Sequence, residues 1–292
     1  MFFKILLFEI SNRIRRPAVY LYFAAILVFS ILSFGTGSLP VQDKEHINSP
    51  YLIAFWMAGM TMMMMLVSSS IMGTALYRDI EFNTKDYYLT YPITKSGYFW
   101  GRYVGAFLCM IFIGSAIPIG IFLGTQIGPA LGWKDAAQFG SNRLIYYLHP
   151  FLTIALPNIF FTSSLFFGLV AATRNIKVIY FGGILLFLCY FISIFFLNNT
   201  TNVTVVNIAD PFALNPVRYQ TFNSNSTQQN TTLIPIVGAI LINRMLWSSV
   251  GLVVILITFI RFTFEKFFSG RSDRSAIDET VAKEKSFAFV KP

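Results

Sequence analysis

The stretch that decides the fold is "FWGRYVGAFLCMIFIGSAIPIGIFLG", residues 99–124, in which Arg102 is the one charged residue. A helix needs about 20 mostly apolar residues to cross the hydrocarbon core of a bilayer. A strand of a membrane barrel would be about ten residues long and would alternate in polarity. The run is therefore predicted to be a membrane-spanning helix, and Arg102 near its start does not exclude a span because an arginine can snorkel at a helix end.

Similar apolar runs recur along the whole chain, which has 292 residues, 55% of them hydrophobic and only 12% charged. Soluble domains carry about 25% charged residues, so this composition indicates the bilayer as solvent. The sequence predicts an all-α membrane protein in which residues 1–268 form a single transmembrane domain. The six predicted spans are residues 18–37, 51–74, 99–124, 150–172, 177–197 and 245–264.

The segment before the first span, "MFFKILLFEISNRIRRP", mixes apolar residues with basic ones. Glu9 and Arg13 are spaced to pair on one helical face. Residues 2–16 are predicted to form an amphipathic helix lying in the membrane interface and ended by Pro17. A cleaved signal peptide is the alternative, but the basic region is long and no clear small-residue cleavage site follows.

The basic residues are distributed unevenly between the two sides of the predicted topology. If the N-terminus is cytoplasmic, the inner segments hold 17 of the 22 Lys and Arg residues and the outer segments hold five. Cytoplasmic loops carry such an excess. We therefore expect both termini in the cytoplasm, with residues 269–292 as a polar tail. The net charge of +9 follows from this topology, so no nucleic-acid partner is expected.

Two segments near the outer side break the pattern of long apolar runs. Residues 198–232 are polar and of low complexity, which favours a flexible exposed loop. The apolar stretch "LIPIVGAILINR", residues 233–244, is too short to span and contains Pro235 and Gly238. It is predicted to form a re-entrant or interfacial hairpin before the last span.

Small residues recur at four-residue spacing in the third span. Gly101 and Gly105 form one such pair, and Gly120, Gly124 and Gly128 form a longer series. Residues at this spacing share a helix face, and their size lets another helix approach closely. The partner helix belongs either to the same chain or to a second copy across a dimer.

The sequence lacks the motifs of an enzyme or of an autonomous transporter. There is no GxxxxGK[ST] loop for phosphates and no HExxH zinc motif, and all 13 acidic residues fall in expected loops, the N-terminal helix or the tail. An ion-coupled carrier usually needs an ionisable group inside the membrane. No catalytic residue, cofactor site or metal site is therefore predicted, and an ATP-independent channel or carrier is disfavoured.

Sulfur-containing residues are concentrated in the second span, in "MAGMTMMMML", residues 57–66. Thioethers bind Cu(I), but methionine also fills irregular gaps in packed interiors. Packing is favoured, with a pliable lining for apolar substrates and copper handling as alternatives. Cys109 and Cys189 lie inside apolar runs without metal spacing and are interpreted as small apolar side chains.

One polar segment separates the second and third spans, "ALYRDIEFNTKDYYLTYPITKSGYFWGRYVGAF", residues 75–107. Residues 80–91 are long enough for about three helical turns, and Pro92 ends them. The simplest interpretation is a solvated connector whose charges follow the positive-inside rule.

The order of residues in this segment resembles the corresponding cytoplasmic loop in permeases of type-2 ABC exporters. That loop places an acidic residue, a threonine and a second acidic residue before two apolar residues, Thr and Pro, and then a basic entry to the third span. The matching positions are Glu81, Thr84, Asp86, Tyr87, Tyr88, Thr90, Pro92, Lys95, Arg102 and Gly105. Asn83 stands where glycine is frequent, and the two tyrosines stand where leucines are.

The resemblance extends over nearly the whole chain, and the C-terminal span is similar to the N-terminal membrane half of bacterial permease–aminopeptidase fusion proteins. It implies a permease that works with separate ABC ATPase subunits, which would bind ATP and Mg²⁺, and with a second permease as a homo- or heterodimer. The implied ATPase-docking loop comprises Arg78, Asp79, Glu81, Thr84, Asp86 and Pro92. A non-transporting membrane scaffold that anchors an ATPase is the alternative function.

Overall fold

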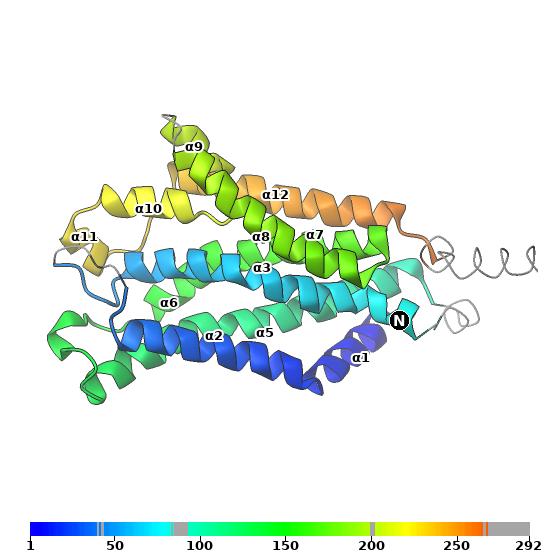
Figure 1. Ribbon diagram of the computed structural model, residues 1–292, viewed down its shortest axis with the longest axis horizontal. Coiled ribbons are helices and arrows are strands. Elements are labelled where there is room, and N and C mark those ends of the chain that lie inside the picture. The colour runs from blue at the N-terminus through cyan, green and yellow to red at the C-terminus, as the bar shows by residue number, and fades with distance from the viewer. Residues whose placement is uncertain are drawn as a thin grey trace, which may run out of the picture.

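The computed structural model describes residues 1–39, 41, 44–82, 84, 93–198, 202–264 and 267. Its described residues form helices joined by turns, without a strand. The long helices lie side by side along the long axis of the molecule (Figure 1). The all-α prediction is confirmed for these residues.

Five helices are long and apolar enough to cross a membrane. They are α2 (Pro17–Gly35), α3 (Pro50–Glu81), α5 (Lys95–Ala130), the continuous run of α6 (Leu144–Pro150), η2 (Phe151–Ala155) and α7 (Leu156–Thr173), and α12 (Gly238–Arg261). Each coincides with a predicted span. The sixth prediction, residues 177–197, coincides with helix α8 (Ile176–Asn198), and its crossing of the membrane stays a prediction, as does the position of the termini.

Helix α1 (Phe2–Ile14) packs against the first turns of α5. A methyl group placed on Gly101 would come within 2.8 Å of Ile5, and one on Gly105 within 2.8 Å of Glu9. The absence of these side chains lets the two helix backbones approach closely. One of the predicted glycine pairs therefore serves contact within this chain.

The second glycine series on α5 packs against α2. A methyl group on Gly120 would lie 2.7 Å from the carbonyl oxygen of Leu27, and one on Gly124 would lie 2.6 Å from that of Ile31. One face of α5 therefore holds α1 near its start and α2 near its end. Figure 1 shows α1 and α2 following one another along α5, with a bend between them.

Helices α3 and α5 extend beyond the apolar runs that predicted them. Helix α3 continues to Glu81, where residue 74 was the predicted end, and α5 begins at Lys95, where residue 99 was predicted. The added turns contain polar side chains that are buried against one another, so hydropathy alone does not reveal them. The helix predicted over residues 80–91 falls mostly outside the described residues.

The predictions for the end opposite α1 need correction. Residues 203–231 form three short helices, α9 (Val203–Ala209), α10 (Leu214–Phe222) and α11 (Ser226–Thr231), where a flexible loop was predicted. Buried Phe212 and Val217 anchor them against the long helices. The hairpin predicted for residues 233–244 is wrong, because α12 begins at Gly238 and includes the rest of that stretch.

The interior of the bundle is centred on α3. Met57, Met60, Met64 and Met72 are all buried in the main apolar cluster. Because methionine is unbranched and adaptable, a row of methionines can fill the uneven spaces between α3 and its neighbours. The geometry agrees with the packing interpretation of the methionine-rich stretch.

Candidate functional site

Glu9 of α1 is the centre of a buried cluster of charges at the end of the bundle that carries α1. Its side chain is fully buried and accepts hydrogen bonds from three guanidinium groups. The donors are Arg13, at 2.7 Å, Arg78 of α3, at 2.9 Å, and Arg102 of α5. Arg13 lies one helical turn after Glu9, as the sequence predicted.

Asp79 of α3 is the second carboxylate of this cluster. The Arg102 guanidinium donates to both of its oxygens at 2.7 Å. The hydroxyl of Tyr98 donates to Asp79 Oδ2 at 2.6 Å, and the Tyr98 side chain is fully buried. We call these residues the inner ion network, which comprises Glu9, Arg13, Arg78, Asp79, Tyr98 and Arg102.

Helix periodicity explains how three segments place their groups together. Tyr98 and Arg102 lie four residues apart and share a face of α5, and Glu9 and Arg13 do the same on α1. Arg102 contacts both carboxylates and so joins α1, α3 and α5. The ring of Phe8 lies over this region, 5.6 Å from the Arg102 guanidinium carbon.

The electrostatics favour an ionised Glu9. Burial by itself would raise the pKa of this carboxyl. The guanidinium groups of Arg13, Arg102 and Arg78 outweigh burial and bring the pKa below its ordinary value. Three cations face two carboxylates in the network, so the network carries an excess of one positive charge.

The structure describes four of the six sequence-predicted docking residues. Arg78 and Asp79 are buried in the inner ion network, so their side chains are engaged within this chain. Glu81 is exposed at the last residue of α3. Thr84 donates hydrogen bonds to the Asp79 carbonyl oxygen from its backbone N–H, at 3.1 Å, and from its hydroxyl, at 3.0 Å.

The remaining two predicted positions, Asp86 and Pro92, lie outside the described residues. Glu9, Tyr98 and Arg102 were not predicted as site residues, although the Glu9–Arg13 spacing was a signal. Arg102, near the start of the third predicted span, is buried inside the bundle. Its side chain is 3% exposed, because two carboxylates from other helices satisfy it inside the bundle.

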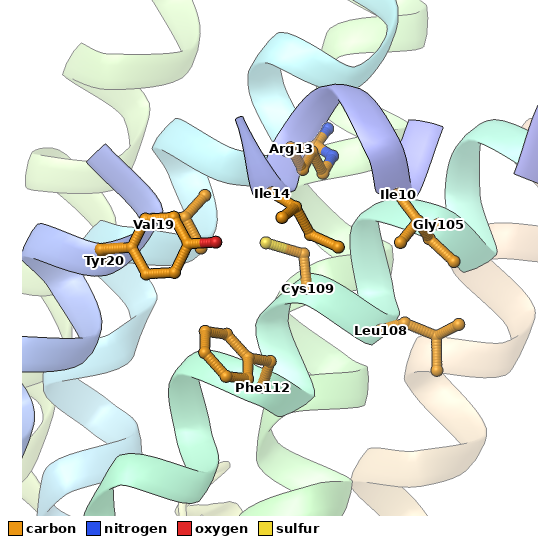
Figure 2. A pocket seen from close by; sticks show the side chains of 9 residues that line it. All are labelled: Ile10, Arg13, Ile14, Val19, Tyr20, Gly105, Leu108, Cys109 and Phe112. Carbon is orange, nitrogen blue, oxygen red and sulfur yellow. The ribbon is translucent and has the colours of Figure 1, made fainter. Parts of the chain in front are cut away.

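An apolar hollow of about 400 Å³ lies beside the network, between α1, α2 and α5. Figure 2 shows Arg13 and Ile14 of α1 on one side of it and Phe112 of α5 across from them. The sulfur of Cys109 lies between these groups and Val19 of α2 (Figure 2). Cys109 of α5 therefore lines the hollow together with residues of α1 and α2.

A second buried polar cluster lies toward the opposite end. Arg244 of α12 donates to the side chain of Asn158 on α7 and to the carbonyl oxygen of Pro211, the latter at 3.0 Å. Asp210 is fully buried and accepts a hydrogen bond of 2.6 Å from the Tyr190 hydroxyl of α8. The cluster fastens the short helices of residues 203–231 to the bundle.

The two clusters show where two of the acidic residues lie. Asp79 is in the last turn of α3, where a loop was predicted, and Asp210 is in the turn after α9, in a loop as predicted, with its side chain buried against Tyr190 of α8. Both have cationic or hydrogen-bonding partners, which is how buried carboxylates are normally accommodated. Among the described residues, His, Cys, Asp and Glu side chains do not gather in groups of three that could hold a metal ion.

The chain was also compared with known proteins. No protein-family model matches it, and it matches no curated protein.

Proposed function

We propose that this chain is the membrane-spanning permease subunit of an ATP-driven ABC exporter. The observation that carries the proposal is the inner ion network at the ends of α3 and α5, which flank the docking-like segment. The resemblance of residues 81–105 to the docking loop of such permeases indicates that the partner is an ABC ATPase. The chain has no phosphate-binding loop of its own, so in this proposal ATP and Mg²⁺ bind to a separate ATPase subunit.

In the proposed mechanism, the inner ion network couples the movements of the helices that it connects. A partner that moves the segment between Glu81 and Lys95 applies force to the end of α3 and the start of α5. Arg102 joins Asp79 of α3 to Glu9 of α1, so the three helices move as one body. Charged hydrogen bonds buried from water are costly to break, which makes the network stiff enough to transmit force.

The transport path requires a second permease subunit in this proposal, either a second copy or a related chain. The substrate would pass along the interface between the two subunits. The exposed faces of the long helices are apolar and fit lipid or peptide cargo as well as a bilayer. In this proposal the energy comes from ATP hydrolysis by the partner, and the path lies between two permease subunits.

The association of the ATPase is tested by capture of the tagged chain from its native membranes. Vanadate-sensitive ATP hydrolysis is measured in the eluate. We expect hydrolysis from the wild type and its loss from the double variant Glu81→Lys/Asp86→Lys, because reversing two acidic charges repels a basic docking surface.

The matched control is Asp135→Lys, which makes the same kind of charge change at an exposed position before η1 (Ala136–Gln138), far from α1. The eluate of this control variant should hydrolyse ATP at the same rate as that of the wild type. Equal hydrolysis from the loop variant and the control would refute the docking assignment. If the captured ATPase hydrolyses ATP at the same rate with and without each added substrate, the scaffold function is favoured.

A further inference from the structure

A basic cavity lies at the α1 end of the bundle, separate from the inner ion network. It has a volume of about 580 Å³ and lies between the end of α3 and the short turn that joins α7 to α8. Tyr77 and Ile80 line it from α3, and Arg174, Asn175 and Lys177 line it from the turn. The described residues that line it include two cations and no acidic residue.

A second cavity, of about 270 Å³, adjoins the first and shares Ala172 and Arg174 with it. It lies between α7 and α12, and its lining is mainly apolar. Gly168 and Ala171 contribute from α7, and Ile257 and Arg261 contribute from α12. A polar, basic compartment is therefore joined to a mainly apolar one that lies between two spanning helices.

Within the part of the chain that the structure describes, the cations of these cavities form no salt bridge. Among the described residues, Arg174, Lys177 and Arg261 take part in none of the salt bridges, which all belong to the inner ion network. The Nε atom of Arg174 is buried and has no hydrogen-bond acceptor in the described residues. A buried donor without an acceptor costs about 1–3 kcal/mol, so an external acceptor would be stabilising.

The geometry points to a binding site for an anionic phospholipid. The headgroup phosphate would accept hydrogen bonds from Arg174 and Lys177, and one acyl chain would lie in the apolar cavity between α7 and α12. Basic pockets between transmembrane helices are suited to anionic headgroups because the phosphate lies at the same depth as the cations. Arg261 lies at the junction of α12 with the following turn, where it can contact the same phosphate.

This inference rests on the membrane-spanning fold and is independent of the proposed ATPase. The lipid is favoured over an acidic segment of a partner protein because the cavity that adjoins the cations has a mainly apolar lining. An acidic peptide would meet the charge of the first cavity and leave the second one empty.

Native mass spectrometry of the purified chain tests the site with lipids of identical acyl chains. We expect phosphatidylglycerol to be retained at least tenfold more tightly than phosphatidylcholine. The double variant Arg174→Gln/Lys177→Gln should lose this preference, and Arg174→Lys should keep part of it because the charge remains. The control Lys134→Gln/Arg218→Gln removes the same charge elsewhere and should bind like the wild type.

Folding of each variant is checked by its helical circular dichroism and its melting temperature. Equal retention of the two lipids by the wild type would overturn the proposal. So would an unchanged preference in a folded double variant. Displacement of phosphatidylglycerol by a soluble acidic peptide, with no effect of acyl chain length, would assign the cavity to a protein partner.

Discussion

The Asp79 carboxylate of α3 lies 2.7 Å from the Arg102 guanidinium of α5, across the segment that connects the two helices. Both side chains are buried, and Arg102 also contacts Glu9 of α1. One side chain of α5 thus contacts the middle of α1 and the last turn of α3. The consequences can be tested residue by residue.

The first prediction concerns the loss of this central cation. Arg102→Ala leaves Asp79 buried without a charged partner, which should lower the free energy of unfolding by about 3–5 kcal/mol. Chemical unfolding in detergent, followed by tryptophan fluorescence, measures the change. Arg218→Ala, at an exposed position of α10, should change stability by less than about 0.5 kcal/mol.

A double-mutant cycle with Asp79→Asn and Arg102→Gln separates the pair from its surroundings. Residues in direct contact show coupling energies of about 0.5–3 kcal/mol. Purely additive effects of the two substitutions would mean that the salt bridge does not join α3 to α5 in the folded protein.

The second prediction is a pH dependence set by Glu9. Its pKa is lower in the folded chain than the ordinary value of 4.5, so its contribution to stability is complete above that value. The contribution is lost as the pH falls through the lower pKa of the folded state, because protonation then removes the charge. Glu9→Gln should therefore be less stable than the wild type at pH 7, with the difference shrinking below about pH 4.5. Melting temperatures measured across this range would contradict the assignment if the difference grew in acid.

The third prediction concerns the close packing of α1 against α5. Gly105→Ala places a methyl group 2.8 Å from Glu9 and should cost about 1–3 kcal/mol by overpacking. In a Cys189→Ser background, Cys109 should also react faster with a membrane-permeant maleimide, because α1 moves away from the apolar hollow. Gly59→Ala is the control, since its methyl group would lie 3.7 Å from Leu214. Equal labelling rates in both variants would contradict the close contact.

The fourth prediction concerns the polar cluster at the opposite end. Arg244→Met keeps much of the side-chain length and removes the donors to Asn158 and Pro211. We expect faster hydrogen exchange in residues 203–222, because the short helices lose part of their attachment. Arg218→Met, on α10 itself, should leave exchange unchanged, and an equal increase in both variants would indicate a nonspecific effect.

Hydropathy was sufficient to predict five of the long helices, because each contains an apolar run of the length that a bilayer requires. It placed the end of α3 too early and the start of α5 too late, since the added turns contain Arg78, Asp79 and Lys95. These charges look like loop residues until their partners are known. Glu9, Asp79 and Arg102 are far apart in sequence, so their meeting is a property of the fold.

In the segment of residues 203–231, sequence composition failed to predict ordered structure. Its composition is polar, with many Asn, Thr and Gln residues, and so predicted a flexible loop. In the fold, Asp210 accepts hydrogen bonds from the backbone N–H groups of Phe212 and Asn215 and fixes the turn. Local hydrogen bonds of this kind order a polar segment without an apolar run that hydropathy could detect.

The most direct test of the central claim is site-specific photocross-linking from the docking segment in native membranes. A benzophenone side chain replaces Asp86 in one variant and Asp135 in the control, and the adducts are identified by mass spectrometry. We expect position 86 to cross-link to a protein containing a GxxxxGK[ST] nucleotide-binding loop, and position 135 not to. Adducts at position 86 that contain only lipid, or proteins without a nucleotide-binding loop, would contradict the proposal that an ATPase docks there.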